Sequence, residues 1–164
     1  MGGNAELIET FYAAFARKDG DTMASCYRAD ASFSDPVFPH LSAEEAGAMW
    51  RMFCRPDSDL TVTFRDVRTE DDHGSAHWSA EYTFPPTGRK VRNEIDAEFS
   101  FAGGKIVSHR DEFDFFRWSR MALGAPGYLL GWSPLVRSKV RGQAASQLRR
   151  FMESEGGPAT RNGA

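Results

Sequence analysis

An imidazole and a carboxylate lie two residues apart in the segment Val107-Ser-His-Arg-Asp111. Side chains at alternate positions of a strand point to the same face. The strand predicted over residues 106–116 therefore has a packed face, which comprises Val107, His109, Asp111, Phe113 and Phe115. Buried polar groups are costly unless they are paired, and they gather in functional pockets. His109 could act as a general acid or base near neutral pH, with Asp111 or Asp35 orienting its ring. The alternative is a polar pair that only hydrogen-bonds within the fold.

A second carboxylate, Asp35, directly precedes Pro36 at the end of a short predicted strand over residues 31–35. Proline cannot donate to a strand ladder, so the strand ends there. An aspartate in this position often forms an Asx turn, in which its carboxylate accepts backbone N–H bonds. Asp35 is therefore either a site residue that works with His109 or a turn residue.

The segment from residue 90 to 101 shows the clearest structural pattern. Every even position is charged or hydroxylic, and every odd position except Asn93 is apolar. This alternation predicts a strand with one wet face and one packed face. Strands predicted over residues 60–65, 75–84 and 106–116 join it through three hairpins. We expect them to form a strongly curved antiparallel sheet.

Three predicted helices precede these hairpins. The first two cover residues 5–18 and about 22–28, and the third begins after Ser42, where Glu45 completes a capping box. The apolar face of the sheet must be covered, and these helices can cover it. The sequence thus predicts one α+β domain over residues 1–118, a cone-shaped curved antiparallel sheet covered by three N-terminal helices.

Residues 119–155 are predicted to extend the same domain. An irregular, Gly-rich stretch leads to an added C-terminal helix, which Ser133 caps and whose polar face is basic. That face is either solvated or in contact with an anionic partner or membrane surface. The stretch before it either closes the pocket as a lid or swaps onto a second subunit, and its apolar side chains are Tyr128, Leu129, Leu130 and Trp132. We expect the tail over residues 156–164 to be disordered.

The composition is that of a soluble protein, with 164 residues, 41% hydrophobic, 26% charged and a net charge of −3. We expect no nucleic-acid partner and no membrane insertion, because the net charge is acidic and no apolar run is long enough. The N-terminus has no signal segment, so we expect a cytoplasmic protein. Cys26 and Cys54 lack metal-ligand spacing and are expected to be reduced thiols. We expect neither metal nor cofactor, because no known binding motif can be placed.

Two segments carry a resemblance to a known family. They are Ile8-Glu-Thr-Phe-Tyr-Ala-Ala-Phe-Ala-Arg-Lys-Asp-Gly-Asp21 and Arg28-Ala-Asp-Ala-Ser-Phe-Ser-Asp-Pro36. Both resemble the start of ketosteroid isomerase. More broadly, the chain resembles the nuclear transport factor 2-like superfamily, which includes the SnoaL-like polyketide cyclases, scytalone dehydratase and limonene epoxide hydrolase. The resemblance covers roughly residues 5–117 and implies the same cone. It leaves the reaction open, because this fold hosts many reactions and also non-catalytic binders.

The resemblance also implies site residues. Carried over by motif, the general base of the isomerase falls on Asp35. Its oxyanion-hole tyrosine falls on Phe11, which cannot donate a hydrogen bond, and Tyr12 is expected to face elsewhere on the helix. Its second acid falls on Ala97. Losing one such donor typically costs about a hundred- to a thousandfold in rate, so we do not expect ketosteroid isomerase activity.

The epoxide hydrolases of the superfamily need an Asp–Arg–Asp arrangement. Here Arg110 lies on the opposite strand face from Asp111, and no carboxylate fills the Ala97 position. We do not expect this chemistry either.

The same carry-over implies a pocket wall that comprises Tyr82, Asn93, His109, Asp111 and Phe113. Tyr82 and Asn93 either bind a substrate carbonyl or only satisfy His109 and Asp111. Trp50 is a further substrate-binding candidate that could equally belong to the core.

We therefore expect a small-molecule pocket protein that forms a homodimer. The first candidate function is cofactor-independent acid/base catalysis on a small apolar, ketone-like substrate, as an isomerase, cyclase or dehydratase. Asp35, His109 and Asp111 would transfer the protons. The alternative is a non-catalytic binder of a lipophilic ligand, or a dimeric scaffold, in which Trp and Phe side chains fill the cone.

Overall fold

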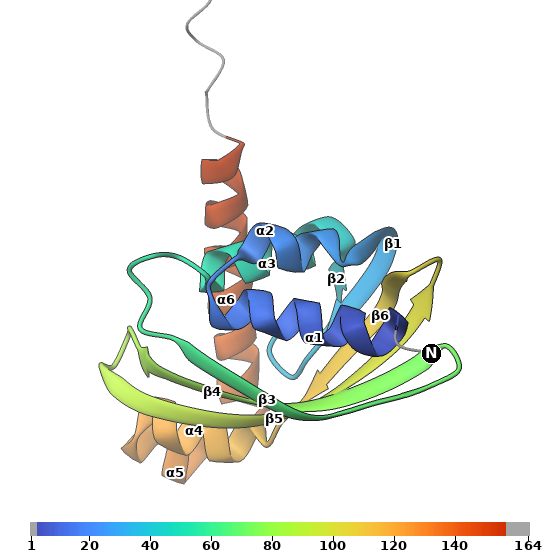
Figure 1. The fold of residues 1–164 in the computed structure, drawn as a ribbon. Helices are drawn as coiled ribbons and strands as arrows, with labels where there is room; N and C mark the ends of the chain where they lie inside the picture. The colour runs from blue at the N-terminus through green and yellow to red at the C-terminus, as the bar shows by residue number, and fades with distance from the viewer. Residues whose placement is uncertain (1–2, 157–164) are drawn as a thin grey trace, which may run out of the picture.

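The computed structural model describes residues 3–156, and a single curved sheet with helices on one side forms the body (Figure 1). The strands are β1 (Tyr27–Ser34), β2 (Leu41–Ser42), β3 (Thr61–Glu70), β4 (His73–Phe84), β5 (Arg89–Ala102) and β6 (Lys105–Glu112). The helices are α1 (Gly3–Ala16), α2 (Gly20–Ser25), α3 (Ala43–Phe53), α4 (Phe115–Leu123), α5 (Ala125–Leu130) and α6 (Pro134–Glu155). Helices α1, α2 and α3 cover the apolar face of the sheet, so the predicted α+β cone is confirmed.

The sheet contains one parallel pair. Its strand order is β2-β1-β6-β5-β4-β3, and β1 runs parallel to β6 while all other neighbours are antiparallel. The chain leaves β1, passes through α3 and three hairpins, and returns beside β1 as β6. The prediction of an antiparallel sheet is therefore correct except at the β1–β6 pair, which is parallel. Phe33 and His109 are direct neighbours across it, so the residues that follow them lie at the same level of the cone.

The alternation in β5 is confirmed. All of its odd-numbered residues from Val91 to Phe101 are buried, Asn93 included. Even-numbered residues face away from the helices, so the inner face of this strand is the wall of the cone. The sequence alone therefore identifies which side of β5 is the packed one.

The inner face of β6 differs from the prediction at both ends. His109 and Asp111 are buried as expected. The face begins with Ile106 rather than Val107, because an irregularity after Ser100 shifts the register by one residue. At the other end Phe115 does not extend the strand, since it is the first residue of α4.

The helix caps follow the sequence closely. The Ser42 side chain accepts from the Glu45 backbone, the Glu45 carboxylate accepts from the Ser42 backbone, and Ser133 caps α6. The second helix differs, because α2 ends at Ser25. Tyr27, expected on that helix, instead begins β1 and is buried in the cone.

Helix α4 covers the end of the β4–β5 hairpin. Phe115, Trp118 and Ala122 form a buried cluster with Val91, and the Trp118 indole N–H donates to the Tyr82 hydroxyl at 2.7 Å. The prediction of an irregular stretch over residues 119–132 is wrong, because the end of α4 and the whole of α5 lie within it. The apolar side chains proposed as a lid, Tyr128, Leu129, Leu130 and Trp132, are exposed, so α4 covers this end instead.

Helix α6 packs against α3 through its C-terminal half, where Leu148 is buried. A bidentate ion pair between Arg51 and Glu155 joins the two helices at 2.6 Å. Nearer its start, the Arg141 Nε donates to the carbonyl of Pro36 at 2.9 Å. The extension is therefore attached to the loop that follows β1. The tail predicted to be disordered lies outside the described residues from residue 157 onward.

Gly20 offers a test of the close approach between α2 and α3. A Cβ atom at Gly20 would lie 2.6 Å from the Cα of Arg51, so Gly20→Ala must push the two helices apart. We expect it to lower the free energy of unfolding by about 1–3 kcal/mol in urea denaturation. Gly142→Ala in α6 is the control, because nothing lies within 4 Å of its added Cβ. That variant should be stabilised by up to about 1 kcal/mol. Equal effects of the two substitutions would contradict this packing.

Candidate active site

Four buried side chains around Asp111 form one hydrogen-bonded network. The Trp50 Nε1 donates to the Tyr27 hydroxyl at 2.9 Å, and that hydroxyl lies 2.7 Å from the Nδ1 of His109. The Nε2 of His109 lies 2.8 Å from the Oδ1 of Asp111, and the Trp78 Nε1 donates to the same oxygen at 3.4 Å. The residues come from α3, β1, β4 and β6, so the network connects most layers of the cone.

The tryptophan at one end fixes one bond of this network. An indole nitrogen only donates, so the Tyr27 oxygen accepts from Trp50. With the Tyr27 proton directed at the Nδ1 of His109, the Nε2 of His109 carries the ring proton and donates it to Asp111.

Aromatic rings enclose His109. Its side chain has no exposed surface, and five ring centroids lie between 4.3 and 6.1 Å from its own: Phe11, Tyr27, Phe33, Trp50 and Phe99. Two open hollows, of about 400 and 550 Å³, occur on the described residues, and neither is lined by His109 or Asp111. This geometry assigns His109 to the support of Asp111 rather than to contact with a ligand. Trp50, also buried, supports Tyr27 in the same way.

Asp35 combines both of its expected roles. Its Oδ1 accepts from the backbone N–H groups of Val37 at 2.7 Å and Phe38 at 2.6 Å, which is the local turn. Burial raises the pKa of this carboxyl to about 7; the Asp111 charge raises it further, while the two backbone bonds and Arg141 oppose the rise. The half-buried Asp35 is thus a carboxyl that gains and loses a proton near neutrality.

Asp35 lies near Asp111. Ser34 and Arg110, the residues that precede them, are the last pair of the parallel ladder, and the Asp111 charge contributes to the raised pKa of Asp35. Among the described residues, neither the Oδ2 of Asp35 nor the Oδ2 of Asp111 has a hydrogen-bond partner. The structure therefore brings together two of the three catalytic candidates as a carboxyl pair, with His109 behind Asp111.

The other candidates of the pocket wall lie toward α4. Burial raises the pKa of Tyr82 to about 12, the bond from Trp118 opposes the rise, and the Asp35 charge adds to it, so Tyr82 lies within electrostatic range of Asp35. Its oxygen accepts from Trp118, which leaves its proton free to donate. Asn93 is 9% exposed on β5, and its side chain has no hydrogen-bond partner among residues 3–156. Phe113 is half-buried between the two apolar clusters.

Sequence reasoning missed two tyrosines. Tyr27 was expected on a helix, although the odd positions from Tyr27 to Phe33 are all apolar and could have indicated a strand. Tyr12 was expected to face elsewhere on the helix than Phe11, and its role in the site was not foreseen. It is fully buried and stacked on Phe64 at 5.4 Å between α1 and the sheet. Burial and the Asp111 charge hold the Tyr12 pKa well above its usual range, and its hydroxyl has no partner among the described residues.

No three His, Cys, Asp or Glu side chains within residues 3–156 are arranged to hold a metal ion. Cys26 and Cys54 are both buried and free, as expected from their spacing. Burial raises the pKa of each thiol, to about 11 for Cys54. Neither cysteine is therefore activated as a nucleophile.

The family follows from a comparison with family models. The model described as the SnoaL-like domain matches residues 8–109, which is more than half of the chain. The chain belongs to the SnoaL-like family. The matched residues include Asp35 and His109 and end just before Asp111. No curated protein matches the chain.

Solved structures agree with this SnoaL-like fold. A limonene-epoxide-hydrolase-like protein of Mycobacterium tuberculosis is 18% identical, with a TM-score of 0.61 over 82% of this chain and 95% of that one. A protein of Catenulispora acidiphila with a ketosteroid isomerase-like fold, in complex with trimethylamine, is 14% identical. Its TM-score is 0.64, over 79% of this chain and 98% of that one. A candidate SnoaL-like polyketide cyclase of Jannaschia is 16% identical, with a TM-score of 0.64 over 76% of this chain and 94% of that one. Identities this low show the shared fold alone.

The SnoaL-like cone of this chain lacks the arrangement that an epoxide hydrolase needs. Arg110 lies on the outer face and forms ion pairs with Glu98 and Glu112. Ala97 is the direct neighbour of Asp111 on β5, so no second carboxylate is present at that position. These positions agree with the expectation from the sequence.

The unpartnered hydroxyl of Tyr12 can be tested by its removal. Tyr12→Phe deletes a buried group that has no hydrogen bond in the protein, so we expect stability to stay level or rise by up to about 1 kcal/mol in urea denaturation. Tyr27→Phe is the matched control, since that hydroxyl has two partners, and it should cost about 2–3 kcal/mol. A comparable loss in both variants would mean that the Tyr12 hydroxyl is hydrogen-bonded in solution.

The raised pKa of Asp35 predicts a pH dependence. The folded-state pKa of about 7 exceeds the ordinary value of 3.8, so the folded state binds the proton more tightly. This contribution stabilises the fold at low pH and is lost as the pH rises from about 4 to 7. Asp35→Asn keeps the turn acceptor but cannot ionise. The free energy of unfolding of Asp35→Asn minus that of wild type should therefore increase by roughly 2 kcal/mol from pH 4 to pH 8. This is about half the value that the full pKa shift would give, because Asp35 is partly exposed.

The measurement is urea denaturation of both proteins across that pH range. Asp30→Asn, on the same strand but exposed and ion-paired with Arg28, serves as the control for a lost carboxylate. A wild-type-to-Asp35→Asn difference that does not change with pH would refute a raised pKa.

Proposed function

We propose that this SnoaL-like protein is a small-molecule enzyme that removes and returns a proton next to a carbonyl group, without a cofactor. The observation that carries this proposal is the carboxyl pair of Asp35 and Asp111, in which Asp35 has a pKa of about 7. A general base works best when its pKa lies near the working pH. Asp35 would take the proton from carbon, which leaves the electron pair on an enolate, and would return it at the same or a neighbouring carbon.

The polar groups around the site suit both the enolate oxygen, which needs hydrogen-bond donors, and the Asp35 base. Tyr82 has a free hydroxyl proton to donate to the enolate oxygen, and Tyr12 and Asn93 offer further donors on the same inner wall. Asp111 is held in place by His109 and Trp78, and its charge adds to the rise in the Asp35 pKa that burial causes. His109 would be a positioning residue in this scheme, because aromatic rings separate it from solvent.

An apolar ketone-like substrate is supported by the aromatic and aliphatic inner wall of the cone. The larger hollow, of about 550 Å³, is lined by Tyr82, Val91 and Met121 together with charged side chains, among them Asp59, Lys90 and Arg92. Neither Asp35 nor Asp111 lines it. The names of the similar structures, which include polyketide cyclases and an epoxide hydrolase, are consistent with small, largely apolar substrates.

One observation favours the alternative, a non-catalytic binder of a lipophilic ligand or a dimeric scaffold. Trp50, Trp78 and Phe residues fill the cone around His109, as such a protein would require. Loss of catalysis with retention of ligand binding would identify this alternative. The homodimer and the cytoplasmic location remain predictions from the sequence.

Exchange of α-protons tests the enzyme proposal without knowledge of the natural substrate. We expect the protein to accelerate deuterium incorporation next to the carbonyl of 2-tetralone in D₂O, followed by proton NMR. Asp35→Asn should slow the protein-dependent rate by about a hundredfold or more. The rate should rise with pH up to about 7 and then level, because ionised Asp35 is the base.

Asp30→Asn is the control and should exchange at the wild-type rate. Equal rates in wild type and Asp35→Asn would remove Asp35 from catalysis. If 2-tetralone raises the melting temperature of wild type but its protons exchange no faster than in buffer, the protein is a binder.

A further inference from the structure

One short segment holds the exposed large apolar side chains of the described chain. They are Tyr128, Leu129, Leu130, Trp132 and Leu135, with exposed fractions between 52% and 81%. Five such side chains within eight residues make a concentrated apolar surface, here called the apolar tip. Single exposed apolar residues are ordinary, whereas a contiguous group marks an interaction site. The tip lies on α5 and the start of α6, outside the candidate active site.

Unpaired cations flank the apolar tip. Residues 115–152 contain seven Arg and Lys residues and no Asp or Glu, although the whole chain has a net charge of −3. The seven are Arg117, Arg120, Arg137, Lys139, Arg141, Arg149 and Arg150. None of them takes part in an ion pair among residues 3–156, whereas six arginines before residue 115 do. Arg141 already donates to the Pro36 carbonyl, and Arg149 and Arg150 lie near the other end of α6. The cations near the tip that remain for an anionic partner are Arg117, Arg120, Arg137 and Lys139.

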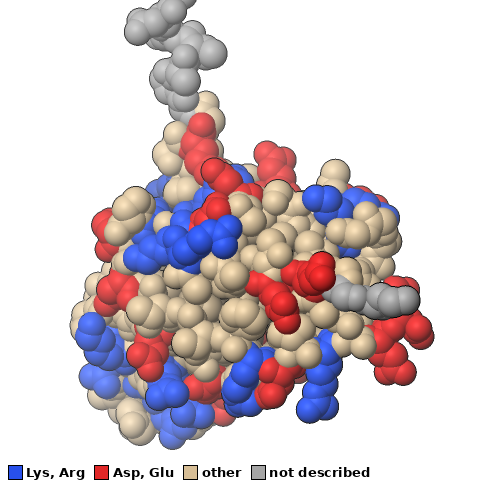
Figure 2. Space-filling model, viewed as in Figure 1, with Lys and Arg blue, Asp and Glu red and all other residues tan. Residues whose placement is uncertain are grey.

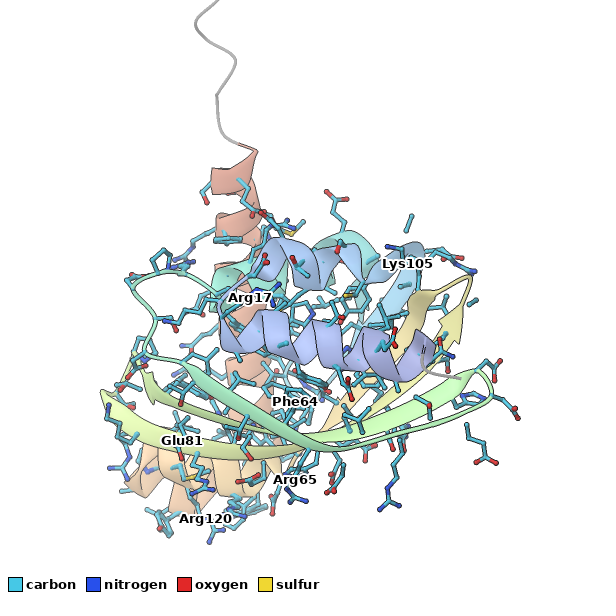
Figure 3. The ribbon with its side chains drawn as sticks, viewed as in Figure 1. Arg17, Phe64, Arg65, Glu81, Lys105 and Arg120 are labelled. Atoms are coloured by element: carbon cyan, nitrogen blue, oxygen red, sulfur yellow. The ribbon has the colours of Figure 1, made fainter. Side chains whose placement is uncertain are left out.

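Two of these cations lie directly beside the tip. The Arg120 guanidinium sits 4.8 Å from the Phe116 ring and 5.7 Å from the Tyr128 ring, and its Nε is buried without a hydrogen-bond partner. Arg137 lies over the Phe115 ring at 5.0 Å. Figure 3 shows Arg120 where α4 and α5 lie, and Figure 2 shows basic side chains, with acidic ones among them, at this end of the molecule. Apolar and cationic groups thus share one surface.

We propose that the apolar tip and its flanking cations bind the surface of an anionic lipid bilayer. Leucines gain by entering hydrocarbon, Trp and Tyr favour the headgroup boundary, and Arg and Lys bind lipid phosphates. The contact is peripheral: within residues 3–156, no helix is both long and apolar enough to span a membrane. The sequence prediction of no membrane insertion concerns spanning and is compatible with it.

Two other occupants fit less well. A nucleic acid would satisfy the cations but leave the leucines in water. A second copy joined by a two-fold axis would place the tip against itself and bring its cations face to face. A head-to-tail contact would lack an apolar counterpart, because the exposed large apolar side chains of the described residues all belong to the tip.

Vesicle flotation with the full chain tests the proposal. The vesicles contain phosphatidylcholine alone or with about 30% phosphatidylglycerol. We expect binding to the anionic vesicles to be about tenfold stronger or more, and to weaken by a similar factor between low and high salt. Equal binding to both vesicle types, or binding to neither, would overturn it.

Matched variants separate the apolar and charge contributions. Leu129→Ser/Trp132→Ser and Arg137→Glu/Lys139→Glu should each reduce binding to the anionic vesicles about tenfold or more. Arg28→Glu/Arg65→Glu makes the same change of net charge on exposed residues elsewhere and should reduce it less than about threefold. Equal losses in the two charge variants would mean non-specific attraction and would overturn the proposal.

Size-exclusion chromatography adds a check against self-association. We expect Leu129→Ser/Trp132→Ser to leave the elution volume and the melting temperature unchanged, because these side chains are exposed. Conversion of an oligomer to a monomer by this variant would assign the tip to a subunit interface and overturn the lipid proposal.

Discussion

A carboxylate enclosed by aromatic rings is the constraint on which the site depends. Asp111 is 2% exposed, and an ionised carboxylate in such surroundings costs several kcal/mol unless donors compensate it. His109 and Trp78 are those donors, and Tyr27 and Trp50 hold His109 in turn. One buried charge thereby sets the relative positions of α3, β1, β4 and β6. The aromatic residues fill the remaining space, which is why this half of the cone is closed.

The parallel pair of β1 and β6 decides which carboxyls meet. In an antiparallel arrangement the residues after β1 would lie toward the opposite end of β6. Here they continue alongside it, so Asp35 lies level with Asp111. The cone is thereby divided into a rigid aromatic part around His109 and a polar part around Asp35 and Tyr82. Of these residues, Tyr82 lines the hollow of about 550 Å³.

Much of this arrangement follows from local sequence patterns. Alternation in β5 and β6 identifies the inner wall, with Asn93, His109 and Asp111 as its polar exceptions, and the capping box at Ser42 locates α3. The family resemblance adds Asp35. These features are predictable because each depends on residues close together in the chain.

The rest depends on distant pairings. Tyr27 pairs with Ile106 across a register shift in β1, so its place in the sheet depends on a strand that is distant in the sequence. The burial of Tyr12 depends on its contact with Phe64 of β3, on the other side of α1 from the Phe11–Trp50 contact. Helix α5 contains a Pro and a Gly within six residues, and α4 packs on Val91 and on α5, which are contacts that local sequence does not specify.

The tryptophans at both ends of the Asp111 network have a consequence for hydrogen exchange. An indole N–H neither accepts a proton nor gives one up near neutral pH, so neither Trp50 nor Trp78 can pass a proton from water into the network. The ring proton of His109 thus has no hydrogen-bonded route to solvent through either end. Its remaining connection is through Asp111, whose free oxygen adjoins Asp35. The lifetime of that one proton therefore reports how readily the carboxyl pair exchanges protons with solvent.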